Sequence, residues 1–294
     1  MELPNPVMTA SGTVGHGTEV GEYLDLAALS AVVVKSLSAE PWAGNPPPRL
    51  HETSAGMLNS VGLQNPGVEA WIEHDLPALE ARGARVVASI WGFTVEAYAK
   101  AASMLAEVAD RLVAVEVNLS CPNIEARKDM FAHSATATGE VVDATAVCSR
   151  PRWAKLSPNV TDIAEIGAAA LAAGAEALTL INTVMGMAID VERRRPSLGA
   201  GGGGLSGAAI RPVAVRAVYD CRQALPDAPI VGVGGVSTGA HAVELLMAGA
   251  DAVQVGTATF FEPRAPVRVL QELGMWCVRH GVSNVRDLRG AAHA

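Results

Sequence analysis

The chain has 294 residues, of which 50% are hydrophobic and 18% are charged, and its formal net charge is −8. A chain of this length and hydrophobicity can bury a large core, while its acidic balance argues against nucleic acid as a partner, because phosphate backbones are bound by clustered Lys and Arg. The four cysteines are far apart and form no C-x-x-C pair, which argues against a metal site, an iron–sulfur cluster or a disulfide framework. No signal peptide is visible and no apolar run reaches the roughly 20 residues that span a bilayer, so we expect a cytoplasmic protein that does not bind a membrane.

Short apolar runs alternate with longer helical patterns along the whole chain. The predicted strands are residues 6–10, 31–35, 86–91, 114–119, 153–156, 178–182, 230–233 and 252–255. The predicted helices include residues 68–82, 95–111, 162–173, 208–224 and 240–248. Strands that are continuously hydrophobic are typical of parallel sheets buried on both faces. Eight such units predict a (β/α)8 TIM barrel that forms a single domain over residues 1–294, with a doubly wound sheet as the alternative.

Three longer segments interrupt this alternation, at residues 36–67, 122–138 and 185–207. Each follows a strand, so we expect all three at the carboxyl face of the barrel, where active sites of this fold lie. Long loops of this kind are usually lids or binding segments. The glycine run at 199–204 is equally compatible with a passive connector.

Polar residues and glycines end the predicted strands, and their side chains should converge on the barrel mouth. They are Ser11, Lys35, Ser36, Ser89, Asn118, Ser120, Cys121, Lys155, Asn182, Thr183, Gly234, Gly235, Gly256 and Thr257. The Gly234-Gly235 and Gly256-Thr257 pairs end the seventh and eighth predicted strands, where these barrels usually hold a phosphate group. Thr238 is a candidate N-cap for the helix that follows the first pair.

Cys121 is the sharpest single candidate for chemistry. A buried cysteine is usually a small hydrophobic residue, which is our interpretation of Cys148, Cys221 and Cys277. Cys121 differs because it follows a strand and opens a long loop. His133 lies in the same loop without a recognisable pairing, so we favour a proton acceptor that needs no histidine partner.

Residues 118–123, Asn-Leu-Ser-Cys-Pro-Asn, resemble the dihydroorotate dehydrogenase family. The resemblance runs from about residue 4 to about residue 265 and rests on several motifs in the same order. They are NPVMTASG at 5–12, MLNSVGLQNPG at 57–67, KLSPNV at 155–160, INT at 181–183, GGLSG at 203–207, GGV at 234–236 and VGTA at 255–258. Each motif alone is weak, but the set is highly specific.

The resemblance implies an FMN cofactor bound across the barrel mouth. The residues that it places beside FMN are Ser11, Lys35, Ser36, Ser89, Asn118, Lys155, Ile181, Gly207, Gly234, Gly235, Gly256 and Thr257. Lys155 would stabilise negative charge on the reduced ring, and the glycines with Thr257 would hold the phosphate.

The resemblance also implies oxidation of dihydroorotate to orotate in pyrimidine biosynthesis. Cys121 would take the C5 proton while hydride passes from C6 to FMN, and Lys35 would pair with the substrate carboxylate. The implied substrate residues are Lys35, Asn59, Ser60, Val61, Gly62, Leu63, Asn118, Asn123, Asn182 and Thr183. Amides suit a pyrimidine ring because each offers a donor and an acceptor. We expect the 122–138 segment to close over the substrate.

Within the family the chain is most similar to the soluble class 1 enzymes of the NAD-linked type B, since the membrane-associated members carry serine in place of Cys121. That type passes electrons to a separate subunit with FAD and a [2Fe–2S] cluster, so we expect a homo- or hetero-oligomer. The chain departs from the family pattern in three places. Ser89 replaces a usual asparagine near FMN, and Ala188 replaces a usual arginine. The sequence also begins about ten residues after the family's usual start, so either a hairpin that would plug the bottom of the barrel is incomplete or the assigned start is too late.

Three alternatives remain open at this point. A dihydropyrimidine dehydrogenase-type reaction would keep FMN, although those proteins usually have histidine where Asn123 stands. A Schiff-base aldolase would use Lys35 or Lys155 as nucleophile. An inactive barrel that binds a phosphate ligand would show binding without turnover.

Overall fold

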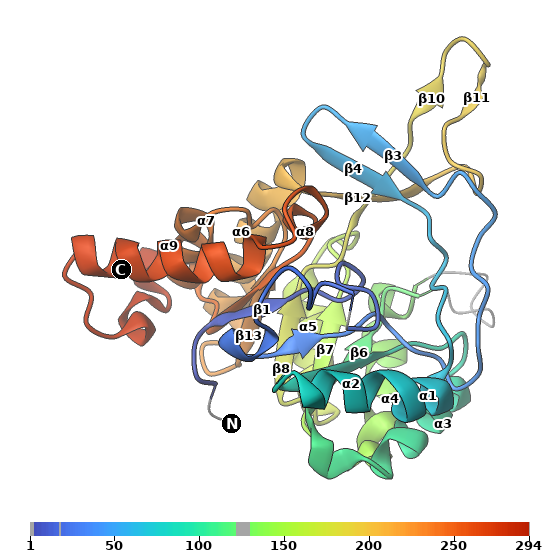
Figure 1. Cartoon of the computed structure of the whole chain (residues 1–294), viewed down its shortest axis with the longest axis horizontal. Helices are drawn as coiled ribbons and strands as arrows, with labels where there is room; N and C mark the ends of the chain where they lie inside the picture. Colours follow the sequence, from blue (N-terminus) through green and yellow to red (C-terminus); the bar gives the residue numbers. More distant parts are fainter. Residues whose placement is uncertain (1–2, 18, 122–129, 294) are drawn as a thin grey trace.

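Parallel strands form a barrel at the centre of the protein, of which the computed structural model describes residues 3–17, 19–121 and 130–293 (Figure 1). The barrel strands are β1 Val7–Thr9, β2 Val32–Val33, β5 Val86–Ile90, β6 Leu112–Asn118, β7 Arg152–Leu156, β8 Ala177–Leu180, β13 Ile230–Val233 and β14 Ala252–Val255. They lie in the order β1, β14, β13, β8, β7, β6, β5, β2. Hydrogen bonds from Ser30 N to Val7 O (2.9 Å) and from Thr9 N to Ala31 O (3.3 Å) join β1 to the chain entering β2 and complete the ring. The predicted (β/α)8 barrel is confirmed, and the predicted strand bounds are within two residues of those observed.

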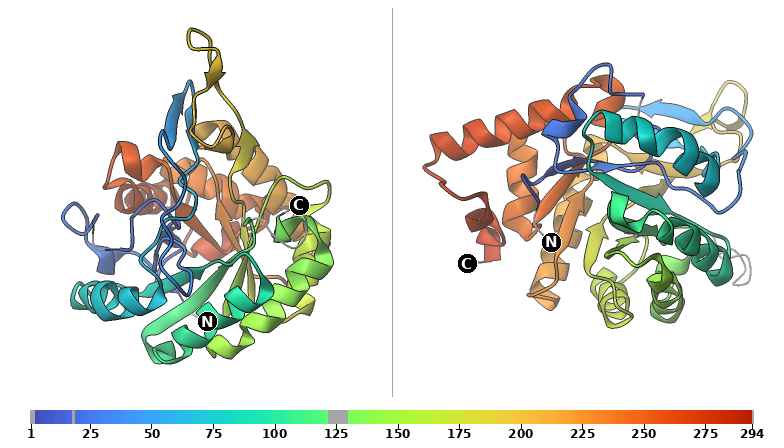
Figure 2. Two further views of the ribbon diagram at one scale, coloured as in Figure 1. Left: turned by 90° about the vertical axis from the view of Figure 1, so that its right-hand side faces the viewer. Right: turned by 60° about the horizontal axis from the view of Figure 1, so that its bottom comes forward.

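Helices wrap the outside of the barrel (Figure 2). They are α1 Val68–Ala70, the π-helix η2 Trp71–Asp75, α2 Leu76–Ala81, α3 Val95–Ala106, α4 Ala135–Ala144, α5 Ile163–Ala172, α6 Arg211–Ala224, α7 Gly239–Ala248, α8 Ala258–Phe261 and α9 Ala265–Arg279. Short 3-10 turns are η1 Leu26–Ala28, η3 Ala109–Arg111, η4 Phe131–His133, η5 Thr145–Cys148, η6 Ala208–Ile210, η7 Val285–Leu288 and η8 Ala291–His293. In the described part of the chain, none of the helices has the length and apolarity that crossing a membrane requires.

The helix predictions are largely confirmed, including the N-cap of one helix. Thr238 is the N-cap of α7, because its hydroxyl accepts a hydrogen bond from His241 N at 3.3 Å. Helix α4 begins at Ala135, so the end of the segment expected to be a loop at 122–138 is helical. Helices α8 and α9 follow the last strand and are additional to the predicted set, and α9 packs against α7 and β1.

Two of the segments expected to be long loops pair with each other above the barrel. An antiparallel sheet in the order β3, β4, β12, β9 joins Leu50–Thr53, Gly56–Asn59, Gly203–Ser206 and Val184–Gly186. A further hairpin, β10 Ile189–Asp190 with β11 Arg195–Pro196, projects from this sheet in Figures 1 and 2. The glycine run is therefore not only a connector, because Gly203 and Gly204 belong to β12 and pair with β4 and β9.

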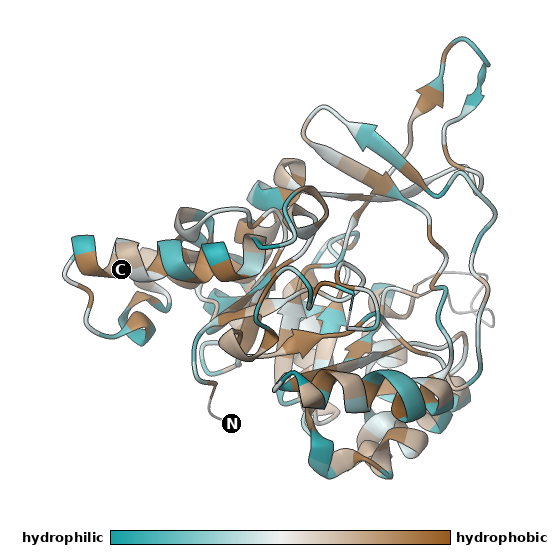
Figure 3. Cartoon of the chain, in the orientation of Figure 1, coloured by the Kyte–Doolittle hydropathy of each residue, from teal (hydrophilic) through white to brown (hydrophobic). Residues whose placement is uncertain are grey.

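The barrel interior is layered because successive side chains of a strand alternate between inside and outside. At the amino-terminal end an apolar layer surrounds Trp153, and its other members are Met8, Ala31, Val33, Val87, Ala114, Ala177, Val231 and Ala252. Two residues further along their strands come Ser89, Glu116, Lys155, Thr179 and Gln254, all buried and polar. The surrounding helices carry both teal hydrophilic and brown hydrophobic segments, as expected for helices with one face on the core (Figure 3). The core thus ends in a polar floor near the carboxyl ends of the strands.

Candidate active site

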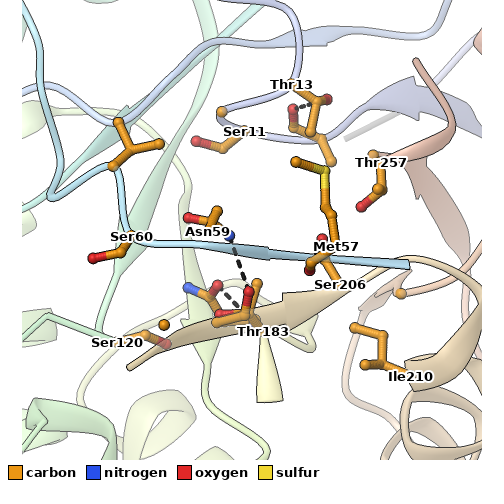
Figure 4. A pocket seen from close by; sticks show the side chains of 18 of the residues that line it. Ser11, Thr13, Met57, Asn59, Ser60, Ser120, Thr183, Ser206, Ile210 and Thr257 are labelled. Atoms are coloured by element: carbon orange, nitrogen blue, oxygen red, sulfur yellow. Dashed lines mark hydrogen bonds between the residues drawn. The ribbon is translucent and has the colours of Figure 1, made fainter. Parts of the chain in front are cut away.

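A cavity of about 430 Å³ lies above this polar floor, between the carboxyl ends of the barrel strands and the β3–β4–β12–β9 sheet. This volume is within the usual range for small-molecule sites. In Figure 4, Ser11, Thr13 and Thr257 lie on one side of the cavity, and Asn59, Ser206 and Thr183 lie on the other. Asn59 is held on its side by a hydrogen bond from Nδ2 to Gly204 O at 3.3 Å.

The structure brings most of the predicted site residues to this one cavity. Of the residues expected at FMN, those that line it are Ser11, Lys35, Ser36, Asn118, Lys155, Ile181, Gly207, Gly234, Gly235, Gly256 and Thr257. Of those expected at the substrate, Asn59, Ser60, Val61, Gly62, Leu63, Asn182 and Thr183 line it as well, in addition to Lys35 and Asn118. Their convergence agrees with the expected mouth, and their individual roles remain predictions.

Three expected residues are not on the cavity wall that the structure describes. Ser89 is fully buried within the polar floor, where it contacts Ser36 and Glu116, and it does not line the cavity. Cys121 is 1% exposed and lies behind the wall. Asn123 falls outside the described residues.

Burial dominates the chemistry of the Cys121 thiol. It raises the pKa of Cys121 to about 12, against smaller lowering effects of a hydrogen bond with Tyr98 and of the Lys35 charge. The Tyr98 hydroxyl donates a hydrogen bond to Asn118 O at 2.5 Å, and Phe131 packs edge-on against its ring. Phe131 N also donates to Cys121 O at 3.3 Å, so this segment is fixed from two sides. In this arrangement the thiol is protonated at neutral pH.

Lys35 lines the cavity, and its pKa is also shifted. Burial lowers the pKa of Lys35, the nearby Cys121 thiolate would raise it, and Lys155 lowers it further. Lys35 and Lys155 both line the cavity, so the site favours an anionic ligand.

A chain of hydrogen bonds orients the polar side chains at the strand ends, next to the floor. The Ser36 hydroxyl contacts Ser89 at 2.9 Å and Ser11 at 3.3 Å, and it accepts a bond from Asn118 Nδ2 at 3.2 Å. Asn182 Nδ2 in turn donates to Asn118 Oδ1 at 3.0 Å. These bonds fix which end of each amide faces its neighbour.

Glycines form the opposite end of the cavity. Gly207, Gly234 and Gly235 have φ values of +94°, +138° and +70°, which side chains rarely adopt. A Cβ atom at Gly235 would also lie 2.5 Å from Arg211 Cβ. The cavity wall here is bare backbone, and such a wall admits the close approach of a phosphate group. The residues present therefore fit the expected FMN, with glycines for its phosphate and polar strand ends for its ring.

The sequence reasoning missed Glu116, Gln254 and Tyr98. Glu116 and Gln254 lie in strands β6 and β14 and are fully buried. The sequence could have pointed to both, because each is a polar residue inside an otherwise apolar strand. A polar or charged side chain that is buried there requires a hydrogen-bond partner. Tyr98 carried no comparable signal, since an aromatic residue at helical spacing is usually part of the core.

Comparison with known proteins agrees with this geometry. A family model described as dihydroorotate dehydrogenase matches residues 1–276. A Desulforudis audaxviator protein named dihydroorotate dehydrogenase B (NAD(+)), catalytic subunit, is 51% identical over 100% of this chain and 95% of its own length. A protein of the same name from Alkaliphilus metalliredigens is 47% identical over 99% of this chain and 96% of its own. A Solibacter usitatus protein named putative dihydroorotate dehydrogenase A (fumarate) is 48% identical over 98% of this chain and 94% of its own.

Proposed function

Since the chain belongs to the dihydroorotate dehydrogenase family, we propose how its residues divide the work of that reaction. The protein is an FMN-dependent oxidoreductase that converts dihydroorotate to orotate in pyrimidine biosynthesis. The observation that carries the residue-level proposal is that one cavity at the strand ends is lined by two lysines, several amides and a glycine wall.

The glycine end and the polar floor would hold FMN. Backbone groups of Gly207, Gly234, Gly235 and Gly256, with the Thr257 side chain, would bind the phosphate. Side chains further along the cavity would line the ring, namely Ser11, Ser36, Asn118, Lys155 and Ile181. When bound, FMN supplies the acceptor for the hydride that leaves C6 of the substrate.

The amide-rich side of the cavity would bind the substrate. Asn59, Asn118 and Asn182 offer donors and acceptors that match the ring carbonyls and N–H groups of a pyrimidine. The segment Ser60, Val61, Gly62, Leu63 and the residue Thr183 would complete this side, and Lys35 would pair with the carboxylate. Asn123 stays a prediction from the resemblance, because it lies outside the described residues.

Cys121 would take the C5 proton. Its thiol must first lose its own proton, and this deprotonation is unfavourable at neutral pH because the pKa of Cys121 is raised. The Lys35 charge is the described feature that favours the thiolate, since the Tyr98 hydroxyl already donates its one proton to Asn118 O. A buried thiolate, once formed, is a strong proton acceptor because little water solvates it.

The electron acceptor is proposed from the relatives. We infer NAD⁺ as the final acceptor, reached through a separate subunit that carries FAD and a [2Fe–2S] cluster. The type B names of two relatives support this, whereas the Solibacter relative is named for fumarate.

Anaerobic titration of the purified yellow protein with dihydroorotate tests the proposal. We expect the flavin absorbance to bleach fully with about one equivalent of dihydroorotate, and not with dihydrouracil. Bleaching by dihydrouracil at a similar rate would overturn the substrate assignment. Reoxidation by fumarate but not by NAD⁺ plus a candidate partner subunit would overturn the acceptor.

A further inference from the structure

Glu116 is a charged residue at the centre of the barrel that the proposed reaction does not use. Its side chain is fully buried on β6, and burying a carboxylate without partners is costly. It has three partners, each from a different strand. Lys155 Nζ of β7 lies 3.3 Å from one carboxylate oxygen, Ser89 of β5 donates to the same oxygen at 3.4 Å, and Gln254 Nε2 of β14 donates to the other at 2.9 Å.

Only one of these partners reaches the cavity. Lys155 lines it, whereas Glu116, Ser89 and Gln254 lie below. The Lys155 side chain is 7% exposed, so its ammonium group also needs a counter-ion, and Glu116 is the carboxylate within 4 Å that the described residues supply. Lys35, on the other side of the cavity, has no such carboxylate among the described residues. The two lysines therefore differ in how their charge is supported.

The carboxylate also fixes the direction of the hydrogen-bond chain above it. A carboxylate can only accept, so Ser89 must donate its proton to Glu116, and Ser36 must donate to Ser89. The Ser36 oxygen is then left as an acceptor for Ser11 and for Asn118 Nδ2. The side-chain oxygen Oδ1 of Asn118 therefore faces Asn182, whose Nδ2 donates a hydrogen bond to it.

We propose that Glu116 is a positioning residue of the flavin site, which holds Lys155 charged and aimed into the cavity and sets the orientation of the Ser36, Asn118 and Asn182 side chains. This inference rests on the proposed FMN site, with Lys155 beside the ring. Glu116 touches neither substrate nor cofactor and acts through Lys155. Without its negative charge, the Lys155 ammonium would be a buried ion without a counter-ion, and its side chain would leave this position.

Sulfite titration of the FMN-loaded protein tests for the positive charge of Lys155 beside the ring. Sulfite adds to oxidised flavin as an anion and leaves negative charge on the ring, so its affinity follows the charge of Lys155 and needs no turnover. We expect Glu116→Gln, which preserves the side-chain shape, to weaken sulfite binding at least tenfold. Glu116→Asp retains the charge and should recover most of the affinity. Sulfite binding by Glu116→Gln that is unchanged or tighter would overturn the proposal.

A double-mutant cycle separates positioning from general damage. Lys155→Met should weaken sulfite binding by itself, and adding Glu116→Gln to it should cause no further loss. Equal losses from Glu116→Gln in both backgrounds would mean that Glu116 does not act through Lys155, and would overturn the proposal. If Glu116→Gln releases FMN, the reference for the double mutant is Lys155→Met alone. FMN binding by the double mutant equal to that of Lys155→Met supports the proposal, and weaker binding contradicts it.

Two controls complete the experiment. Asp251→Asn breaks another partly buried ion pair, Asp251 with Arg222 at 3.0 Å, which does not line the cavity. It should lower the melting temperature and leave sulfite affinity unchanged, and a comparable loss of sulfite affinity in this variant would overturn the proposal. If Lys155→Met alone binds sulfite as the unmodified protein does, the placement of Lys155 at the flavin is wrong, which is a failure of the proposed function and is distinguishable from a failure of Glu116.

Discussion

Cys121 sits behind the cavity wall, although the proposed chemistry requires a proton acceptor in the cavity. Its thiol is buried beside Tyr98, and that burial is what raises its pKa to about 12. The sequence could locate this residue, because it ends a strand and opens a long segment. It could not give the burial, which depends on Tyr98 and Phe131 from other elements.

Replacement of Cys121 by alanine tests its role as base. Cys121→Ala should keep FMN and slow flavin reduction by dihydroorotate at least about 100-fold, since a general base contributes roughly that much or more. Anaerobic stopped-flow absorbance gives the rate. Cys148→Ala is the matched control, because Cys148 is also buried but its thiol faces Arg150 O at 3.5 Å, and it should reduce at the normal rate. Equal rates for Cys121→Ala and the unmodified protein would remove the assignment.

The pH dependence of flavin reduction follows from the same thiol. The thiolate is the active form, and a pKa of about 12 lies above the working range. Raising the pH from about 7 to about 9 should therefore increase the reduction rate by about tenfold per pH unit, with no plateau. The slope should disappear in Cys121→Ala. A plateau near pH 8 would show that the pKa in the reacting complex is far lower than in this structure.

At the scale of elements, the predictions of strands and of a helix cap were correct where they depended on neighbouring residues in the sequence. Strands β13 and β14 have the predicted bounds, and Thr238 caps α7 as its position after the glycine pair suggested. The antiparallel sheet was missed because β4 pairs with β12 across long sequence separation, with Asn59 opposite Gly204. A glycine-rich segment has no alternation of hydrophobic and polar side chains from which such pairing could be predicted.

Two glycines in different elements should respond oppositely to alanine. Gly235 follows β13, the seventh barrel strand, with φ +70°, and a Cβ atom there would lie 2.5 Å from Arg211 Cβ. Gly235→Ala should therefore lower the free energy of unfolding by about 1–3 kcal/mol and weaken FMN binding. Gly274 lies within α9, and a Cβ atom added there would have no neighbour within 4 Å among the described residues, so Gly274→Ala should raise stability by about 0.5–1 kcal/mol.

Urea unfolding and FMN fluorescence titration measure both effects. The FMN dissociation constant of Gly274→Ala should equal that of the unmodified protein, since α9 does not line the cavity. Tight FMN binding by Gly235→Ala would mean that the glycine wall does not hold the phosphate.

At the scale of the whole molecule, the repeated strand–helix pattern was sufficient to predict the barrel. Eight buried strands in a chain of this length leave few other arrangements. The layering inside the barrel was not predicted, because it depends on the register between strands. Glu116 of β6 lies opposite Ser89 of β5 and Trp153 of β7, and no property of β6 alone determines those neighbours.

The seam between β1 and β2 is where the barrel closes, and Thr9 contributes a side chain to it. Its hydroxyl accepts a hydrogen bond from Val33 N at 2.9 Å, and both residues are fully buried. Thr9→Val keeps the shape but leaves the Val33 N–H without its partner. We expect the free energy of unfolding to fall by about 1–3 kcal/mol, the usual cost of an unsatisfied buried group.

Thr179 on β8 provides the matched comparison for this seam. It is equally buried, but its hydroxyl has no hydrogen-bond partner among the described residues. Thr179→Val removes a polar group that gains nothing from burial, so stability should stay the same or rise. Both variants exchange a hydroxyl for a methyl group, but only Thr9→Val also loses a hydrogen bond. The difference between their free energies of unfolding, measured with urea, therefore reports the hydrogen bond. If Thr9→Val and Thr179→Val were equally stable, the Thr9 hydroxyl would not contribute to closing the barrel, and the backbone bonds of Ser30 and Thr9 would have to hold the seam alone.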